Sequence, residues 1–257
     1  MQKSAQKRAL ITGATSGIGK EMAIYLHSLG WQLTLTGRNE EALQRMAALF
    51  GEGTKYIALD LAKRGAAERL YTFCRGDRID LLINNAGFGV FGTFTETSLS
   101  EELELIEVNI RSLHILTKLF LRDFERRDSG CILNVASCAG FMTGPMLSSY
   151  YASKNYVVRL TLAIREELRR RYSRVKVSVL CPGPVDTNFN NRAGVTFSVK
   201  PASPRYVARY AIDRALAGRA IIIPTLGVQL SVLGAKLLPD AVSRAVVYEL
   251  QKRKQRT

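Results

Sequence analysis

The chain has 257 residues, of which 47% are hydrophobic and 23% charged, an ordinary composition for a globular protein. Lysine and arginine number 37 against 22 aspartates and glutamates, a net charge of +15 that favours anionic partners such as phosphorylated cofactors. No aromatic stacking platform interleaves with the basic runs, so we expect no nucleic-acid binding. Four cysteines without CxxC spacing and only two histidines argue against a metal site, and we expect none.

Apolar runs of strand length alternate with amphipathic stretches of helix length along the chain. Strands separated by helices pair in parallel, with both sheet faces covered. The sequence shows no repeat, linker or change in composition, so it predicts one α/β domain over 1–257 with a doubly wound parallel sheet of about seven strands. We predict strands at 8–13, 31–37, 55–60, 79–87, 131–137, 175–183 and 220–224, and helices at 17–29, 39–50, 64–75, 99–127, 150–172 and 203–217.

The first predicted strand ends in the glycine-rich turn TGATSGIG, residues 12–19. Gly13, Gly17 and Gly19 allow the backbone to turn tightly and to approach a pyrophosphate at the start of the next helix. The spacing differs from GxGxxG, because the first two glycines are four positions apart. Its place at the first strand-to-helix crossover favours dinucleotide binding over a merely structural turn.

The end of the second predicted strand indicates which dinucleotide is bound. The sequence there is LTGRN, with Arg38 and no acidic residue to accept hydrogen bonds from a ribose diol. A guanidinium suits a 2′-phosphate, so NADP(H) is favoured, with NAD(H) as the alternative. The alternative is that Arg38 is only a solvated start to the helix at 39–50.

The stretch SSYYASKN, residues 148–155, places two tyrosines before a lysine at the start of a predicted helix. Tyr150 and Tyr151 lie four and three positions before Lys154, so both share a helix face with it. A phenol can protonate the oxygen formed when a carbonyl accepts a hydride. A nearby ammonium is expected to lower the pKa of that phenol. Helical geometry alone does not decide between the two tyrosines.

Taken together, these motifs resemble the short-chain dehydrogenase/reductase family over nearly the whole chain. The resemblance rests on TGATSGIG, NNAG at 84–87, VNI around Asn109, Ser137 after the fifth strand, YYASK at 150–154 and PGPVDT at 182–187. It implies a single-domain Rossmann-type fold and a Tyr-x-x-x-Lys pair, which selects Tyr150 over Tyr151. Cys181 stands where the family often has asparagine, and this changes the expected wall beside the nicotinamide.

The resemblance also implies site residues. In the implied chemistry, Tyr150 is the acid, Lys154 tunes it, Ser137 polarises the substrate oxygen and Asn109 holds a water in the proton relay. Asp60 is expected to meet the adenine amino group, and Thr187 with residues 182–185 the carboxamide. The expected cofactor-binding set is Gly13, Thr15, Ser16, Gly17, Ile18, Gly19, Arg38, Asp60, Leu61, Asn84, Ala86, Gly87, Tyr150, Lys154, Pro182, Gly183, Val185 and Thr187.

The substrate can be predicted only as a class. Phenylalanine, methionine and leucine in 88–94 and 141–150 indicate an apolar pocket, and the substrate loop is expected at 185–200, where Arg192 and Lys200 suit an anionic substrate or a solvated lid equally. We expect an NADPH-dependent reductase of a ketone or aldehyde, such as a 3-oxoacyl thioester. The alternatives are an alcohol, sugar or steroid dehydrogenase and a non-catalytic dinucleotide-binding redox sensor.

Partners and location are the last expectations. The family resemblance implies a homodimer or homotetramer built through the helices at 99–127 and 150–172. The uncharged stretch 220–235 falls short of the roughly 20 residues that span a bilayer, and we expect a cytoplasmic protein. The apolar C-terminal extension 226–257 could cover the substrate site, meet a partner or lie on a membrane. Val242, Val246, Val247 and Leu250 recur at helical spacing, so packing on the protein is expected.

Overall fold

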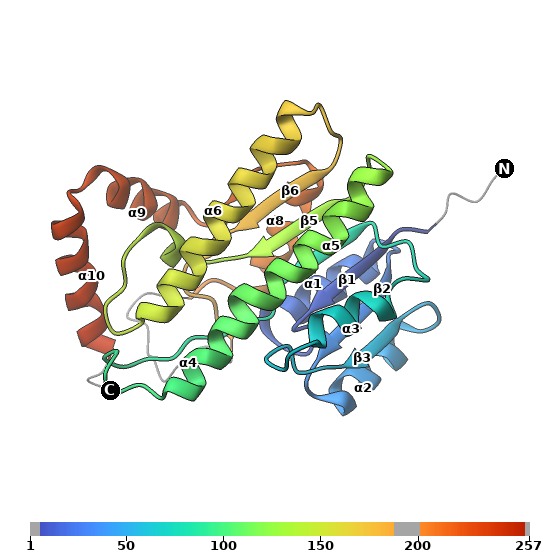
Figure 1. Ribbon diagram of the computed structural model, residues 1–257, viewed down its shortest axis with the longest axis horizontal. Helices are drawn as coiled ribbons and strands as arrows, with labels where there is room; N and C mark the ends of the chain where they lie inside the picture. The colour runs from blue at the N-terminus through green and yellow to red at the C-terminus, as the bar shows by residue number, and fades with distance from the viewer. Residues whose placement is uncertain (1–5, 188–200, 255–257) are drawn as a thin grey trace.

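A computed structural model describes residues 6–187 and 201–254 of the chain. Its centre is one parallel sheet of seven strands in the order β3-β2-β1-β4-β5-β6-β7 (Figure 1). This order is that of a doubly wound sheet, in which ligands bind beyond the carboxyl ends of the strands. The predicted fold class is confirmed. The strands are β1 (Arg8–Thr12), β2 (Gln32–Gly37), β3 (Lys55–Ala58), β4 (Leu81–Asn84), β5 (Cys131–Val135), β6 (Lys176–Leu180) and β7 (Ile221–Ile222).

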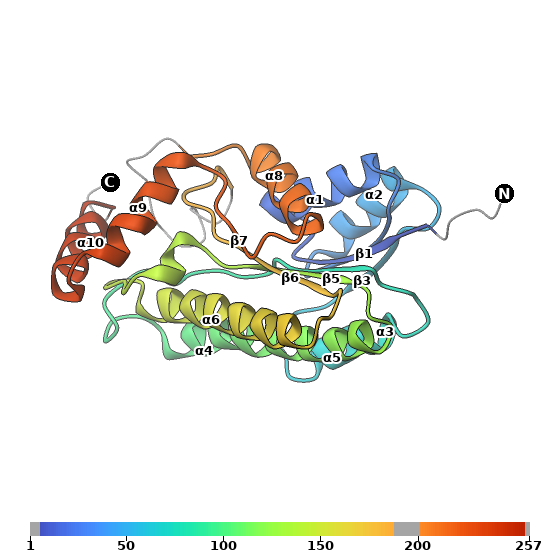
Figure 2. The same ribbon diagram turned by 90° about the horizontal axis from the view of Figure 1, so that it is seen from above.

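Helices cover both faces of the sheet, as Figure 2 shows. On one side lie α1 (Gly17–Ser28), α2 (Glu40–Phe50) and α8 (Pro204–Leu216), and on the other α3 (Ala66–Phe73), α4 (Leu99–Ile106), α5 (Leu113–Arg126) and α6 (Ser148–Arg170). The core strands are buried on both faces, which explains why they read as continuous apolar runs. The buried apolar residues form two large clusters, one on each side of the sheet, and a smaller third cluster that includes Val157 and Val158 of α6.

Local sequence signals account for where individual helices begin. The Asn39 side chain accepts a hydrogen bond of 2.8 Å from the Ala42 amide and so caps α2. Glu40 and Glu41 follow in the first turn, where negative charge is favourable. The helix that we predicted over 99–127 is instead three segments, because a π-helical stretch, η1 (Glu107–Ser112), separates α4 from α5. Asn109 lies within this stretch, and such distortions are frequent at functional sites.

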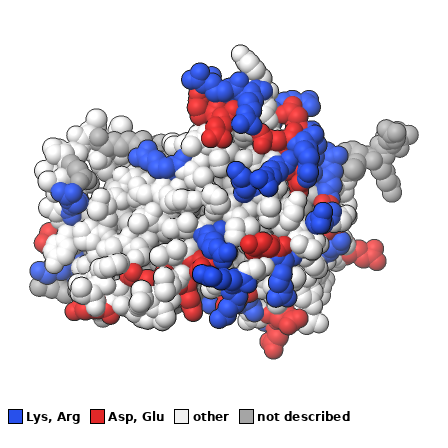
Figure 3. Space-filling view, viewed as in Figure 1, with Lys and Arg blue, Asp and Glu red and all other residues white. Residues whose placement is uncertain are grey.

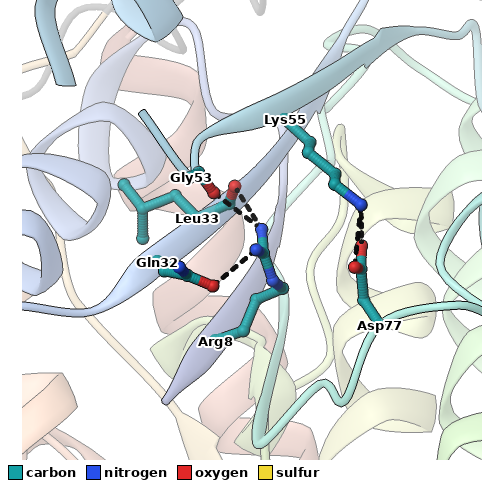
Figure 4. A network of polar contacts seen from close by, with 6 residues as sticks. All are labelled: Arg8, Gln32, Leu33, Gly53, Lys55 and Asp77. Atoms are coloured by element: carbon teal, nitrogen blue, oxygen red, sulfur yellow. Dashed lines mark hydrogen bonds and ion pairs between the residues drawn. The ribbon is translucent and has the colours of Figure 1, made fainter. Parts of the chain in front are cut away.

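A buried arginine connects neighbouring strands at their amino ends, opposite the cavity side of the sheet (Figure 4). Arg8 is 8% exposed, and its guanidinium donates to the carbonyl oxygens of Gly53 and Leu33 at 2.8 and 3.3 Å and to the Gln32 side chain at 2.5 Å. Nearby, Lys55 and Asp77 form an ion pair at 2.8 Å. These contacts join β1 to β2 and to the loop before β3, and β3 to the loop before β4, all far from the carboxyl ends, so we assign them to stability.

The C-terminal extension forms two helices, α9 (Leu226–Leu237) and α10 (Asp240–Lys254), at one end of the molecule (Figures 1 and 2). Only Val247 of the predicted ridge is buried; Val242, Val246 and Leu250 are 45–53% exposed. The expectation that the whole ridge packs on the protein is therefore wrong. The reason is geometric, because α10 contacts the body along a narrow seam formed by Ser243, Val247 and Gln251, each four residues apart.

No helix in the described part of the chain is both long enough and apolar enough to span a bilayer. The described helices include α9 and α10, so this finding covers both helices of the C-terminal extension.

Candidate active site

A cavity of about 700 Å³ opens at the carboxyl ends of the strands. Residues that follow β1, β2, β3, β4, β5 and β6 line it, as the parallel sheet predicts. Most of the predicted cofactor and catalytic residues meet here. They are Gly13, Thr15, Ser16, Gly17, Ile18, Arg38, Asp60, Leu61, Ala86, Gly87, Ser137, Tyr150, Lys154, Pro182, Gly183, Val185 and Thr187.

The glycine turn after β1 has the shape that a phosphate requires. Gly13 and Gly17 have φ of +64° and +52°, in the left-handed region that favours glycine. A Cβ at Gly13 would lie 3.0 Å from the Cα of Ala86, so a side chain would close the space between the two loops. The turn leads directly into α1, whose first amides attract an anion. These residues fit the pyrophosphate of a dinucleotide.

Arg38 and Asp60 lie at the adenosine end of the predicted cofactor site. Arg38 is exposed at the cavity and makes no hydrogen bond or ion pair with any described residue. Its guanidinium is therefore available to an anionic group. Asp60 is half-buried, and its carboxylate accepts a hydrogen bond of 3.0 Å from the Ala62 amide, which fixes its orientation.

Ser137, Tyr150 and Lys154 converge from two different segments. The Ser137 hydroxyl, which follows β5, is hydrogen-bonded to the Tyr150 phenol at the start of α6. Ser137 Oγ also accepts a hydrogen bond of 3.2 Å from the Ala139 amide, which holds it in place. Lys154 Nζ lies 5.7 Å from the centre of the Tyr150 ring and donates to the carbonyl of Val135 at 3.0 Å. The two hydroxyls and one amine thus share a single site.

Burial shifts the pKa values of Tyr150 and Lys154, and it shifts that of Tyr150 in the direction opposite to the one expected. Burial raises the pKa of Tyr150, and the hydrogen bond with Ser137 opposes that rise only in part. The expected lowering by Lys154 is therefore not seen. Lys154 is itself 4% exposed, and burial lowers the pKa of its amine to about 8. At neutral pH the site thus holds a protonated phenol beside an amine that is close to titration.

Asn109 is placed behind the cavity rather than on its wall. Its side chain donates to the carbonyl of Phe88 at 2.9 Å and accepts from the amide of the same residue at 3.1 Å. It also donates to Ser153 Oγ at 3.1 Å. A Cβ at Gly87 would lie 2.9 Å from Asn109 Oδ1 and 3.2 Å from Lys154 Nζ, so all three groups meet at one point. Asn109 therefore positions the loop after β4 against the lysine.

Two further predicted residues do not reach the cavity wall. The Asn84 side chain is buried in the sheet and donates to Asn134 Oδ1 at 2.9 Å and to Thr117 Oγ1 at 3.0 Å. Gly19 has no room for a side chain, since a Cβ there would lie 2.4 Å from the carbonyl oxygen of Gly13. Both residues support the cavity floor from beneath. Arg192 and Lys200, and with them most of the predicted substrate loop, lie outside the described residues.

Three side chains from the C-terminal helix complete the cavity and were not predicted individually. Val247, Leu250 and Gln251 of α10 line it together with Tyr151. Gln251 is 1% exposed and donates a hydrogen bond of 2.8 Å to the Tyr151 phenol. The signal in the sequence was the apolar character of 226–257. One of the three interpretations of that segment was that it covers the substrate site. Asn85 was also missed; its side chain donates to the Thr12 and Gly13 carbonyls and braces the glycine turn.

Comparison with known proteins agrees with this architecture. The sequence profile of the short chain dehydrogenase family matches residues 7–196. A very-long-chain 3-oxoacyl-CoA reductase of Mycosarcoma maydis is 36% identical over 181 residues, which cover 67% of this chain and 51% of that protein. The chain thus spans about half the length of this relative.

Solved structures extend the similarity to the whole fold. A short-chain dehydrogenase from Sphingobium yanoikuyae in complex with NADPH superimposes with a TM-score of 0.81 at 26% identity, over 90% of this chain and 93% of that one. A short-chain dehydrogenase/reductase from Burkholderia phymatum in complex with NAD gives 0.79 at 26% identity, over 91% and 94%.

The sheet order, the glycine turn and the cavity at the strand ends define a protein of the Rossmann-type doubly wound class. Within that class, the chain belongs to the short-chain dehydrogenase/reductase family, because the family profile matches most of its length. The family resemblance that the motifs indicated is confirmed.

Proposed function

We propose that the chain is an NADPH-dependent reductase that converts a ketone or an aldehyde into an alcohol. The observation that carries the proposal is the hydrogen bond between Ser137 and Tyr150, beside the buried Lys154 amine and in the same cavity as the glycine turn. A phenol, a hydroxyl and an amine in one dinucleotide-sized cavity are the groups that carbonyl reduction needs. The NADPH and NAD bound by the two structural neighbours support a nicotinamide dinucleotide as cofactor.

The preference for NADP(H) is inferred from Arg38. Its exposed guanidinium at the cavity supplies planar donors for a 2′-phosphate, and no acidic residue stands at the end of β2 to accept bonds from a ribose diol. The glycine turn and the first amides of α1 hold the pyrophosphate. Asp60, fixed by its bond to the Ala62 amide, is the acceptor for the adenine amino group.

The side chains divide the proton chemistry between them. When bound, the dinucleotide supplies a hydride to the carbonyl carbon. Ser137 donates a hydrogen bond to the carbonyl oxygen, where negative charge develops. Tyr150 gives its phenolic proton to the same oxygen, and its raised pKa keeps that proton in place at neutral pH until it is needed. Lys154, positively charged below a pKa of about 8, stabilises the phenolate that remains.

The substrate class is inferred from the apolar wall of the cavity. Phe88, Met142, Leu147, Val247 and Leu250 line the same cavity as Tyr150, together with the more polar Tyr151. Such a lining suits an acyl chain or another lipid-like group next to the reacting carbonyl. The 3-oxoacyl substrate in the name of the Mycosarcoma maydis relative supports this inference.

The test is NADPH and NADH oxidation, followed by absorbance, with a panel of 3-oxoacyl thioesters, diketones, aldehydes and steroids. Tyr150→Phe should reduce kcat by at least about a thousandfold, because the acid is lost. Tyr151→Phe is the matched control and should retain turnover. Loss of turnover in Tyr151→Phe alone would reject Tyr150 as the acid. Tight NADPH binding without turnover on any substrate would reject the reductase.

A further inference from the structure

Helix α9 faces the cavity on one side and solvent on the other. On the inner side, Val232 is 4% exposed and Ser231 borders the cavity. Val228 packs so closely against the loop after β6 that a Cβ at Gly183 would lie 2.4 Å from its Cγ2. This contact fixes the helix on the body of the protein. The orientation of its outer side is therefore determined by the fold.

The outer side of α9 is a row of exposed leucines. Leu226, Leu230, Leu233 and Leu237 are 76%, 69%, 55% and 78% exposed. Their spacing of four, three and four positions places them on one face of the helix. Leu238 and, on α10, Val242 and Val246 are 45–48% exposed and add to the apolar surface. Single exposed leucines are ordinary, but an apolar helix face of this kind marks an interaction site.

The segment that contains this face has a net positive charge in its sequence. Segment 226–257 contains six lysines and arginines against two acidic residues, a net of +4. Arg244 and Lys252 of α10 are among those whose side chains are exposed. Figure 3 shows charged side chains gathered over the opposite half of the molecule, while the surface around α9 and α10 carries few. An apolar face on a segment of net positive charge suits a partner that is apolar inside and anionic outside.

We propose that the leucine face of α9, defined as Leu226, Leu230, Leu233 and Leu237, binds the surface of an anionic lipid bilayer. Twelve residues of helix extend about 18 Å, less than the hydrocarbon thickness of about 30 Å, so the helix lies in the interface and does not cross it. The leucines enter the boundary between headgroups and acyl chains, and the basic residues meet the anionic headgroups. The inner side of the same helix remains against the cavity.

A second copy of the chain fits this face less well. Two copies joined through α9 would bring two segments of charge +4 together, on molecules that each carry +15. Like charges at a contact oppose association, whereas an anionic surface reverses the sign of the same interaction. The charge of the chain therefore selects lipid over self-association. This binding is independent of the proposed reductase activity and is measured without substrate.

The experiment is co-sedimentation of the full chain with vesicles of phosphatidylcholine alone or with about 30% phosphatidylglycerol. Binding should require the anionic lipid and should fall several-fold between about 0.05 M and 0.5 M salt. Leu230→Glu combined with Leu237→Glu should weaken binding by at least about tenfold, because two apolar contacts become charges of the repelled sign. Leu49→Glu is the matched control, since Leu49 on α2 is 76% exposed and lies in another part of the surface.

Equal vesicle binding by the wild-type chain and the double variant would overturn the proposal, as would equal binding to both vesicle types. Light scattering after gel filtration tests the competing explanation, which is that the leucine face is a contact between two copies of the chain. If the double variant is a smaller assembly than the wild-type chain and the Leu49→Glu variant, the leucine face is a contact between copies and the proposal is wrong. Circular dichroism melting shows that each variant is folded, which these exposed positions should allow.

Discussion

Gln251 Nε2 donates a hydrogen bond of 2.8 Å to the phenolic oxygen of Tyr151, across one hundred positions of sequence. This bond fastens α10 to the start of α6 and places a C-terminal helix on the wall of the candidate active site. Tyr151, the neighbour of the proposed catalytic Tyr150, therefore helps to hold α10 in place.

We predict that Tyr151→Phe lowers the free energy of unfolding by about 1–2 kcal/mol, because the buried Gln251 amide loses its partner. Gln251→Met should cost less, since Gln251 Oε1 is already buried without a partner among the described residues. Urea unfolding of both variants and of the double variant measures the coupling, expected at about 1 kcal/mol. Additive effects would show that the bond contributes nothing to stability.

The buried Lys154 amine should destabilise the folded protein at neutral pH. Its pKa is about 8, below the ordinary value of 10.5, so the folded state resists the charged form. At about 1.4 kcal/mol for each pKa unit, Lys154→Met should raise the free energy of unfolding by up to about 3 kcal/mol, less the lost bond to Val135. Turnover should be abolished by the same change.

The sign of the pH dependence gives a sharper check on Lys154. Below pH 8 both states are protonated and the penalty is complete; it declines between pH 8 and 10.5 and is absent above. The advantage of Lys154→Met in thermal or urea unfolding should therefore shrink across that window. An advantage that is constant with pH would mean that packing, and not charge, is responsible.

Carbonyl reduction should depend on the charge of Lys154. As the pH rises through about 8, the amine loses its proton and no longer stabilises the Tyr150 phenolate. We predict that kcat/KM for NADPH, which reports groups of the free enzyme, falls up to about tenfold per pH unit above this point. Tyr151→Phe should leave the break unchanged. A flat profile to pH 10 would remove Lys154 from this role.

Arg38 should determine the choice of cofactor. We predict that Arg38→Ala raises the KM for NADPH by about ten- to a hundredfold, because the 2′-phosphate loses its charge-assisted hydrogen bonds. The KM for NADH should change by less than about threefold, since NADH has no such phosphate. Steady-state kinetics with both cofactors gives the comparison. An equal rise in both values would show that Arg38 supports the loop and does not recognise the phosphate.

Two thiols should be inert in the folded protein. Burial raises the pKa of Cys74 and of Cys131 to about 12. At pH 8 only roughly one molecule in ten thousand then carries either thiolate, which is the reactive form. Mass spectrometry after treatment with a thiol reagent should find both residues unmodified in the native chain and modified in guanidinium. Rapid native labelling of Cys74 would show that its helix opens.

The sequence by itself determined the architecture and the shape of the cofactor site. Apolar runs separated by helices require a parallel sheet covered on both faces, and this follows from burial alone. The glycine turn could be interpreted because the backbone conformation of a turn is a local property, as the positive φ of Gly13 and Gly17 shows. Arg38 could be placed at the cavity because it directly follows a strand of that sheet.

Only the tertiary structure decided properties that depend on distant neighbours. Asn84 donates into the sheet because Asn134 and Thr117 happen to lie beside it. The pKa of Tyr150 is raised because burial outweighs its hydrogen bond with Ser137, and the degree of burial cannot be read from a motif. The sequence also did not predict which side of α9 faces solvent. An apolar helix has no polar face from which its exposed side could be identified. That choice was made by Val228 and Val232 packing against the body, which left the leucines outside.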